Sequence, residues 1–231
     1  MAQQPTPGRM EAFSDGVIAV IITIMVLDLK VPQAAGVAGL ESVVPTLAVY
    51  FASFVFVGVY WINHHHLVDK LQHTDALVLW ANLFFLFFLS LLPFFTAYLI
   101  STQISPFSVQ LYAASLLVTG FSFQALSRAI VRNLRRGLGL SREQEQSDAA
   151  ARQHFAELSK GWLSVALYTT AVVLARWAAH AALVLAAGVT LLWIVPSLGL
   201  NRKLPGQLTG PDATVESAVD PDRQSLQEES R

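Results

Sequence analysis

The 231-residue sequence contains no cysteine, which excludes disulfide bonds and thiolate chemistry. Charged residues are also scarce, at 13% of the chain against about 25% in a typical soluble domain. Long polar stretches are few, and no polar segment is long enough to fold as a separate soluble domain. These absences exclude an ordinary soluble protein and indicate an integral membrane protein.

Hydrophobic residues make up 54% of the chain, and they form runs near the roughly 20 residues that cross a bilayer. We predict an all-α membrane protein with six spans, at 10–31, 42–64, 76–100, 106–127, 159–176 and 179–199. The last two come from one apolar stretch, which we divide at the polar residues of Arg176–His180. Pro93 and Pro196 lie inside spans, where proline is tolerated as a kink and indicates packing rather than chemistry.

Positive charge is distributed unevenly about these spans. Of the fifteen lysines and arginines, only Lys30 and Arg176 fall in loops that follow odd-numbered spans. Because positive residues are retained in the cytoplasm, both termini are predicted to be cytoplasmic, in a protein of the inner (plasma) membrane. The first span is not expected to be a cleaved signal peptide, because Glu11 and Asp15 do not suit a positively charged leader.

The chain outside the spans divides into three parts. Residues 1–8 are expected to be a flexible leader, and 201–231 a disordered cytoplasmic tail rich in Pro, Gly, Ser and charge. Between them lies a single membrane domain at 9–200. Its polar cytoplasmic connection at 128–158 is expected to contain helical extensions of the neighbouring spans.

The first span begins with unusual polarity. A carboxylate at membrane depth is costly unless it is paired or hydrated, and Asp15 lies more than a helical turn deeper than Arg9, which can reach the boundary. The cytoplasmic ends of the second and third spans offer partners for Ser14 and Asp15, namely Trp61, Asn63, His64, His65, Trp80 and Asn82. We therefore predict that these residues, with Arg9 and Phe13, form a structural polar network that fixes the first three helices. Trp61 and Trp80 are equally typical of a membrane–water interface.

The three consecutive histidines at 64–66 do not predict a metal site. Adjacent helical residues point about 100° apart, so three in a row do not converge on one ion. The sequence also lacks a second cluster to complete a ligand set. We expect no metal, no cofactor and no enzyme activity.

Spacing selects one stripe on the first span. At 100° per residue, a sector about 60° wide holds Gly16, Val20, Thr23 and Leu27, with Ile24 at its edge. Ser14 points about 160° away, so a stripe facing a central axis would leave Ser14 facing the other helices. A rival interpretation is a ridge of small residues that lets helices pack closely, formed by Ala12, Gly16, Ala19 and Thr23. The residues alone leave both open.

Two segments resemble a known family. Arg9, Phe13, Ser14 and Asp15 form an RxxxFSD pattern at the start of the first span, which resembles the motif of the transmembrane protein 175 family in its bacterial six-helix form. The segments YWINHHHL and LWANL resemble the helix 2–3 region of that family. The resemblance covers roughly residues 9–200.

The resemblance implies a potassium-permeable cation channel. Members are homotetramers in which helix 1 of each subunit lines the pore, and this sequence lacks the TVGYG carbonyl filter, as they do. The family constriction falls on Val20, with further apolar rings at Ile24 and Leu27, and the selectivity threonine falls on Thr23. Valine replaces the usual Ile or Leu at the constriction, and His66 stands where a basic residue such as arginine is expected.

Electrostatic reasoning suggests a residue for the pore entrance, and the buried polar residues suggest an alternative function. Glu11 would place a negative ring at the cytoplasmic mouth and concentrate cations there. The alternative is a proton-coupled secondary transporter that uses Asp15 with His64 or His65, although the sequence has no inverted repeat. A scaffold without flux also remains open. Expected partners are further copies of the chain, the lipid bilayer and monovalent cations, and not nucleic acid.

Overall fold

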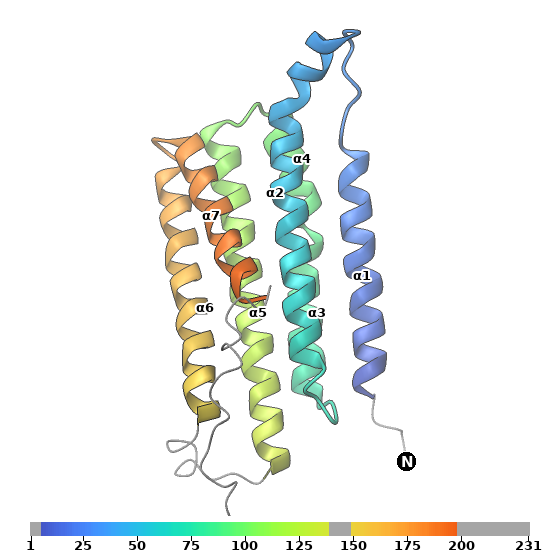
Figure 1. The fold of residues 1–231 in the computed structure, drawn as a ribbon, viewed down its shortest axis with the longest axis vertical. Helices are drawn as coiled ribbons and strands as arrows, with labels where there is room; N and C mark the ends of the chain where they lie inside the picture. Colours follow the sequence, from blue (N-terminus) through green and yellow to red (C-terminus); the bar gives the residue numbers. More distant parts are fainter. Residues whose placement is uncertain (1–5, 139–148, 198–231) are drawn as a thin grey trace, which may run out of the picture. The chain divides into compact units, whose positions relative to one another are not determined.

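The computed structural model describes residues 6–138 and 149–197, and every regular element in these ranges is an α-helix (Figure 1). The helices in chain order are α1 (Pro7–Leu27), α2 (Val37–Val68), α3 (Ala76–Ser90), α4 (Leu92–Ser101), α5 (Pro106–Leu138), α6 (Ala149–Leu174) and α7 (Ala179–Ser197). The predicted tail at 201–231 and the first residues of the predicted leader lie outside the described ranges. Pro7 and Gly8, which we assigned to the leader, are already helical.

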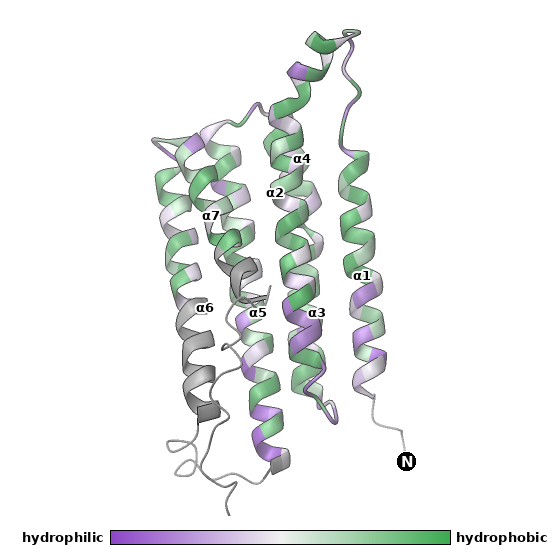
Figure 2. Ribbon diagram, viewed as in Figure 1, coloured by the Kyte–Doolittle hydropathy of each residue, from purple (hydrophilic) through white to green (hydrophobic). Residues whose placement is uncertain are grey.

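Hydropathy supports a membrane protein. Within the described ranges, four segments are long and apolar enough to cross a bilayer: α1, α2, α3 with α4, and α5. The apolar parts of α6 and α7 are shorter, at Gly161–Leu174 and Ala179–Leu191, so the count of six spans stays a prediction. Figure 2 shows most hydrophilic residues of α1, α2 and α5 gathered toward the same end, where α1 begins. We predicted this end to be cytoplasmic.

The third predicted span is two helices in series. α3 ends at Ser90 and α4 begins at Leu92, with Pro93 in its first turn. Proline has no N–H to donate and disfavours a helical conformation in the residue before it, so the first turn of a new helix is its favourable place. Pro93 is buried, which agrees with the expectation that it marks packing.

The other boundaries follow the polar residues. α5 continues to Leu138 and α6 begins at Ala149, so the connection at 128–158 contains the expected helical extensions. α6 ends at Leu174 and α7 begins at Ala179, so the break at 175–178 overlaps the polar stretch that we chose. α5 and α6 approach closely at Gly161, where a Cβ would overlap the side-chain amide of Gln124.

Aromatic rings form the centre of the core. Tyr60 of α2 lies 5.6 Å from Phe85 of α3 and 5.2 Å from Phe123 of α5, measured between ring centroids. Phe85 and Phe123 are themselves 5.2 Å apart, within the range in which aromatic pairs attract. These contacts fix α2, α3 and α5 relative to one another.

A buried hydroxyl cluster joins three helices nearer the other end. Ser53 of α2 donates to the Val49 carbonyl at 3.0 Å and accepts from Thr96 of α4 at 3.1 Å. The hydroxyl of Tyr112 in α5 lies 2.8 Å from the same Ser53 oxygen. In an apolar interior each hydroxyl needs a partner, so this cluster fixes α2, α4 and α5 in register.

Asp75 begins α3. Its carboxylate accepts a 2.8 Å hydrogen bond from the backbone N–H of Val78, the usual arrangement at a helix N-terminus, and lies 3.8 Å from the Arg136 guanidinium. The Val78 hydrogen bond, which favours the charged form, holds the pKa of Asp75 below its ordinary value of 3.8. The cap therefore links the start of α3 to the end of α5.

Substitution of Asp75 by alanine is expected to cost about 1 kcal/mol of stability at neutral pH, because the Val78 N–H loses its acceptor. Because the folded-state pKa is lowered, the contribution of the charge is complete above pH 3.8 and is lost as the pH falls through the folded-state value. Thermal unfolding in detergent, followed from neutral pH to about pH 3, measures this.

Asp75→Asn is the matched control, because asparagine caps a helix as well as aspartate does and does not titrate. The stability difference between the wild type and Asp75→Asn should shrink on acidification. A difference that stays constant across the same range would contradict the assignment of the charge to this cap.

Candidate functional site

α1 has one buried face and one exposed face. The buried residues recur every three or four positions, and they are Met10, Ser14, Ile18, Ile21 and Met25. This face packs against α2, α3 and α4. The spacing argument therefore assigns the correct orientation to Ser14, whose side chain is fully buried.

The stripe singled out in the sequence lies on the exposed face. Val20 is 54% exposed and Leu27 is 80% exposed, and Gly16, Thr23 and Ile24 are also exposed. These side chains cannot be stabilised by the core of their own chain. In a membrane protein such a face meets lipid, another copy of the chain or a pore.

The small-residue ridge is exposed as well. Ala12, Gly16, Ala19 and Thr23 all lie on the open side of α1. A Cβ added at Gly16 would have no described atom within 4 Å. Within the described part of the chain, the ridge therefore does not serve close packing between helices.

Thr23 has a defined hydroxyl orientation. Its Oγ1 donates toward the carbonyl oxygens of Ala19 at 3.1 Å and Val20 at 2.9 Å. The hydroxyl hydrogen is therefore directed at the preceding turn of α1. The oxygen lies on the exposed face beside Val20, with its lone pairs available.

An open groove runs beside this stripe. It has a volume of about 770 Å³ and lies between α1 and the α3–α4 region, with Val20 and Ile24 on one side and Pro93 and Phe94 on the other. Its lining is predominantly apolar. Ser90 and Asp28 are polar residues at its edge.

A chain of hydrogen bonds anchors the buried face. Ser14 donates to the Met10 carbonyl at 2.8 Å, and the Asn82 amide donates to Ser14 at 2.9 Å. The remaining Asn82 oxygen lies 2.8 Å from His64 Nε2, which must therefore carry the hydrogen. The chain joins α1, α3 and α2 through three buried side chains. His64 Nδ1 is buried without a hydrogen-bond partner among the described residues.

Two further contacts join α1 to α2 beside this chain. Trp61 Nε1 donates to the Asp15 carboxylate at 2.9 Å. One helical turn away on each helix, His65 Nδ1 lies 2.9 Å from the Glu11 carboxylate. Asp15 thus finds the indole donor that its depth in the membrane requires. The pairing of Glu11 with His65 was not foreseen, because we considered Glu11 only as an entrance residue.

Other members of the predicted network lie apart from it. The Asn63 amide donates to the Val59 carbonyl of its own helix at 2.7 Å. Trp80 is 72% exposed, which suits the interface role left open above. Arg9 and Phe13 are exposed, and Arg9 makes no ion pair among the described residues.

The three adjacent histidines diverge. His64 is buried, whereas His65 and His66 are exposed, with ring centroids 5.9 Å apart. In the described part of the chain, no three histidine, cysteine or carboxylate side chains are placed to hold a metal ion.

Fold and site together define a class of protein. It is a multi-pass α-helical membrane protein whose first helix is held on one face by polar contacts to α2 and α3. The other face of that helix exposes an apolar stripe that contains a threonine.

Comparison with known proteins identifies the family. The sequence profile described as the endosomal/lysosomal potassium channel TMEM175 matches residues 9–93. A potassium channel of Chryseobacterium sp. is 34% identical over 199 residues, which is 86% of this chain and 98% of the relative. The chain belongs to the TMEM175 family. Because its relatives are channels, the expectation that it is not an enzyme and needs no cofactor is confirmed.

Further comparisons give a solved structure with a similar fold and a relative that is named as a proton channel. The crystal structure of a lysosomal potassium-selective channel TMEM175 homologue from Chamaesiphon minutus superposes with a TM-score of 0.65 at 26% identity, covering 83% of this chain and 97% of that one. The human endosomal/lysosomal proton channel TMEM175 is 34% identical over 97 residues, which is 37% of this chain and 19% of the human protein.

Proposed function

We propose that the chain is a potassium-permeable cation channel of the inner (plasma) membrane, with both termini in the cytoplasm. Four copies assemble so that α1 of each lines a central pore. The observation that carries this proposal is the exposed stripe of Val20, Thr23 and Leu27 opposite the anchored face of α1. Relatives named as potassium channels support the choice of ion.

Assembly would cover the exposed apolar surface of α1. A single copy leaves Val20, Ile24 and Leu27 open, together with the groove between α1 and α4. A central arrangement of four α1 helices turns the stripe toward the axis and brings a neighbouring copy over the groove. The polar contacts to α2 and α3 then keep each α1 in one orientation.

Permeation in this arrangement uses side chains. A potassium ion thins its hydration shell at the apolar rings of Val20, Ile24 and Leu27, and such rings can gate by dewetting. The four Thr23 oxygens offer lone pairs next to the Val20 ring. A filter with so few ligands should select less sharply than a stack of carbonyls. Glu11, paired with His65, adds negative charge near the cytoplasmic mouth.

Single-channel recording tests the function. Purified protein is fused into planar bilayers with potassium on one side and sodium on the other, and its oligomeric state is measured by native mass spectrometry. Discrete openings, with a reversal potential displaced toward potassium, are expected. The absence of discrete openings from folded tetramers would refute the channel and favour a carrier or a scaffold.

Replacement of Thr23 by alanine is expected to lower the preference for potassium over sodium, because the ring loses its four hydroxyl ligands. The reversal potential in the same mixed-salt bilayers measures the effect. Thr169→Ala is the matched control, because Thr169 is also exposed and also donates to its own helix, at the Val165 carbonyl of α6. Unchanged reversal potentials in the Thr23 variant would refute the role of this threonine.

The transporter alternative requires proton transfer between Asp15 and a histidine. The described hydrogen bonds do not join Asp15 to a histidine. Asp15 accepts from Trp61, and the hydrogen-bonded chain that contains His64 ends at the Met10 carbonyl. Relatives named as proton channels still make proton flux worth measuring. Recording in bilayers with a pH gradient and no potassium gradient distinguishes a proton-conducting channel from a proton-coupled transporter. The transporter would give slow, saturable proton flux without discrete openings.

A further inference from the structure

We propose that the cytoplasmic ends of α5 and α6 form a binding site for an anionic phospholipid of the inner leaflet. The site consists of Arg128, Arg132 and Phe121 of α5 with Trp162 of α6, and we call it the arginine–tryptophan site. It lies outside the proposed pore. Its test does not depend on whether the protein conducts ions.

One face of α5 changes from apolar to basic along its length. At 100° per residue, Phe121, Arg128, Arg132 and Arg135 fall within a sector about 60° wide. All four are exposed. Phe121 can therefore contact an acyl chain where the arginines, about two to four turns further on, reach the phosphate. Basic clusters immediately cytoplasmic of a membrane helix attract anionic lipids in this way.

Trp162 gives the basic face a defined geometry. The Arg128 guanidinium carbon lies 5.2 Å from the centre of the Trp162 ring, within cation–π range. Trp162 is 57% exposed, and tryptophan prefers the headgroup level of the membrane. The ring holds the guanidinium in place by its face and leaves the planar N–H edge free for a phosphate.

Carboxylates among the residues whose side chains the structure describes do not neutralise the site. Among the described residues, neither Arg128 nor Arg132 forms an ion pair. Asp75, the acidic residue near the end of α5, lies 3.8 Å from Arg136 instead. Within the described part of the chain, the two arginines of the site therefore present positive charge that a lipid phosphate would complement.

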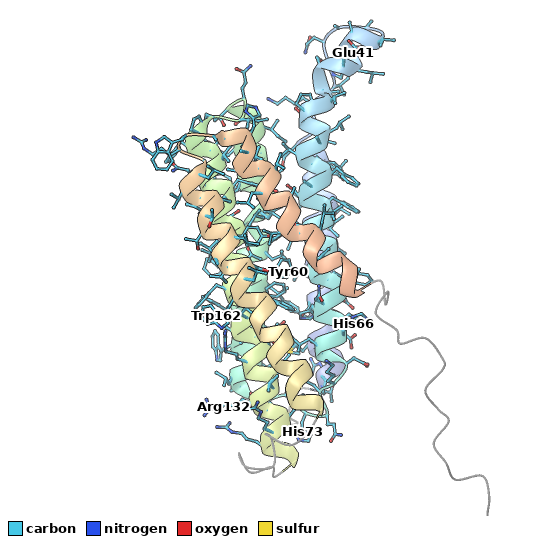
Figure 3. The ribbon with its side chains drawn as sticks, turned by 60° about the vertical axis from the view of Figure 1, so that its left-hand side comes forward. Glu41, Tyr60, His66, His73, Arg132 and Trp162 are labelled. Atoms are coloured by element: carbon cyan, nitrogen blue, oxygen red, sulfur yellow. The ribbon has the colours of Figure 1, made fainter. Side chains whose placement is uncertain are left out.

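The site is placed to meet lipid. α1 packs against α2, α3 and α4, whereas α6 packs against α5 and α7, and Figure 1 shows α6 on the side of the helices opposite α1. A central α1 thus leaves α5 and α6 at the periphery. Figure 3 shows Arg132 and Trp162 projecting from the same edge.

Lipid binding by purified, delipidated full-length protein tests the proposal. Native mass spectrometry compares the affinity for 1-palmitoyl-2-oleoyl phosphatidylglycerol with that for the corresponding phosphatidylcholine. The double variant Arg128→Gln/Arg132→Gln should weaken phosphatidylglycerol binding about 25-fold, since each basic residue near an anionic membrane contributes about fivefold. Phosphatidylcholine binding should not change. Soluble glycerophosphoglycerol, added as a competitor, should displace little lipid, because the Phe121 contact requires an acyl chain.

Arg176→Gln is the matched control. Arg176 is an exposed arginine beside an exposed tryptophan, Trp177, but it lies in the α6–α7 turn at the opposite membrane face, without a basic stripe. It should alter phosphatidylglycerol binding less than twofold, given the absence of neighbouring basic residues. The proposal is overturned if the double variant binds like the wild type, if Arg176→Gln weakens binding equally, or if the soluble headgroup displaces the lipid completely.

A second variant tests the site without removing a charge, so that a loss of lipid binding is not mistaken for misfolding. Trp162→Leu keeps every charge and alters an exposed side chain, so the fold should be retained. It should weaken phosphatidylglycerol binding about threefold, through loss of the cation–π contact. If the arginines act only as a signal for topology, Trp162→Leu will bind the lipid as tightly as the wild type, which also overturns the site.

Discussion

Replacement of Val20 by asparagine is expected to raise the single-channel potassium conductance about tenfold, because a ring of amides would hydrate the constriction that we propose at Val20. A tenfold change corresponds to about 1.4 kcal/mol in the barrier, a modest demand on four polar side chains. Val20 lies exposed on α1 beside the Thr23 hydroxyl, so the change is made without disturbing the buried face. Currents in symmetric potassium solutions measure it.

Three variants sharpen this result. Val26→Asn is the matched control, because Val26 is also exposed on α1 but points about 120° away from Val20. Ile24→Asn and Leu27→Asn test the other apolar rings. An increase at Ile24 or Leu27 alone would move the constriction away from Val20. No increase at any stripe position, or an equal increase at Val26, would contradict a pore lined by this face.

Substitution of Asn82 by leucine is expected to destabilise the protein by about 1–3 kcal/mol, because it leaves the buried Nε2–H of His64 without an acceptor. Ser14 would also lose the donor that joins α1 to α3. The effect should appear as a lower thermal unfolding midpoint in detergent. Because only the contacts of Asp15 and Glu11 to α2 would then fix the rotation of α1 by hydrogen bonds, we also expect fewer tetramers in native mass spectra.

A double variant tests whether the loss of stability comes from the broken hydrogen bond or from altered packing. The double variant His64→Leu/Asn82→Leu replaces both partners by apolar groups, which is nearly neutral where the space is kept. It should recover much of the lost stability. Asn63→Leu is the control, because among the described residues Asn63 donates only to the Val59 carbonyl of its own helix. Equal losses for Asn63→Leu and Asn82→Leu, or no recovery in the double variant, would contradict the proposed coupling.

The sequence predicts much of the fold because membrane segments are specified by local properties. Hydrophobic run length and polar interruptions located the break between α6 and α7 near Arg176–His180, and the helical extensions in the connection at 128–158. Pro93 indicated a change of direction, but not that α3 would end and α4 begin there. The buried cluster of Ser53, Thr96 and Tyr112 was missed, because a single hydroxyl inside an apolar run gives no sign of a partner far away in sequence.

The sequence predicts which residues could take part in the polar site, but not which of them bond to one another. Topology brings the ends of α1, α2 and α3 together, but a rotation of about 100° per residue decides whether Asn63 or His64 faces the interior. Only the packed helices show that His64 bonds to Asn82 while Asn63 bonds to its own helix. The pairing of Glu11 with His65 depends on the same rotation.

The orientation of one hydroxyl also bears on which sign of charge the pathway admits. The single hydrogen of the Thr23 hydroxyl is used on the carbonyl oxygens of Ala19 and Val20. Only oxygen lone pairs are then left on the exposed side, and lone pairs accept but do not donate. Chloride needs donors to replace its water, so a ring of such hydroxyls would reject anions without any carboxylate. Discrimination against chloride at the proposed Thr23 ring would then depend on the direction of a hydrogen bond within the helix, in addition to the charge of Glu11 at the mouth.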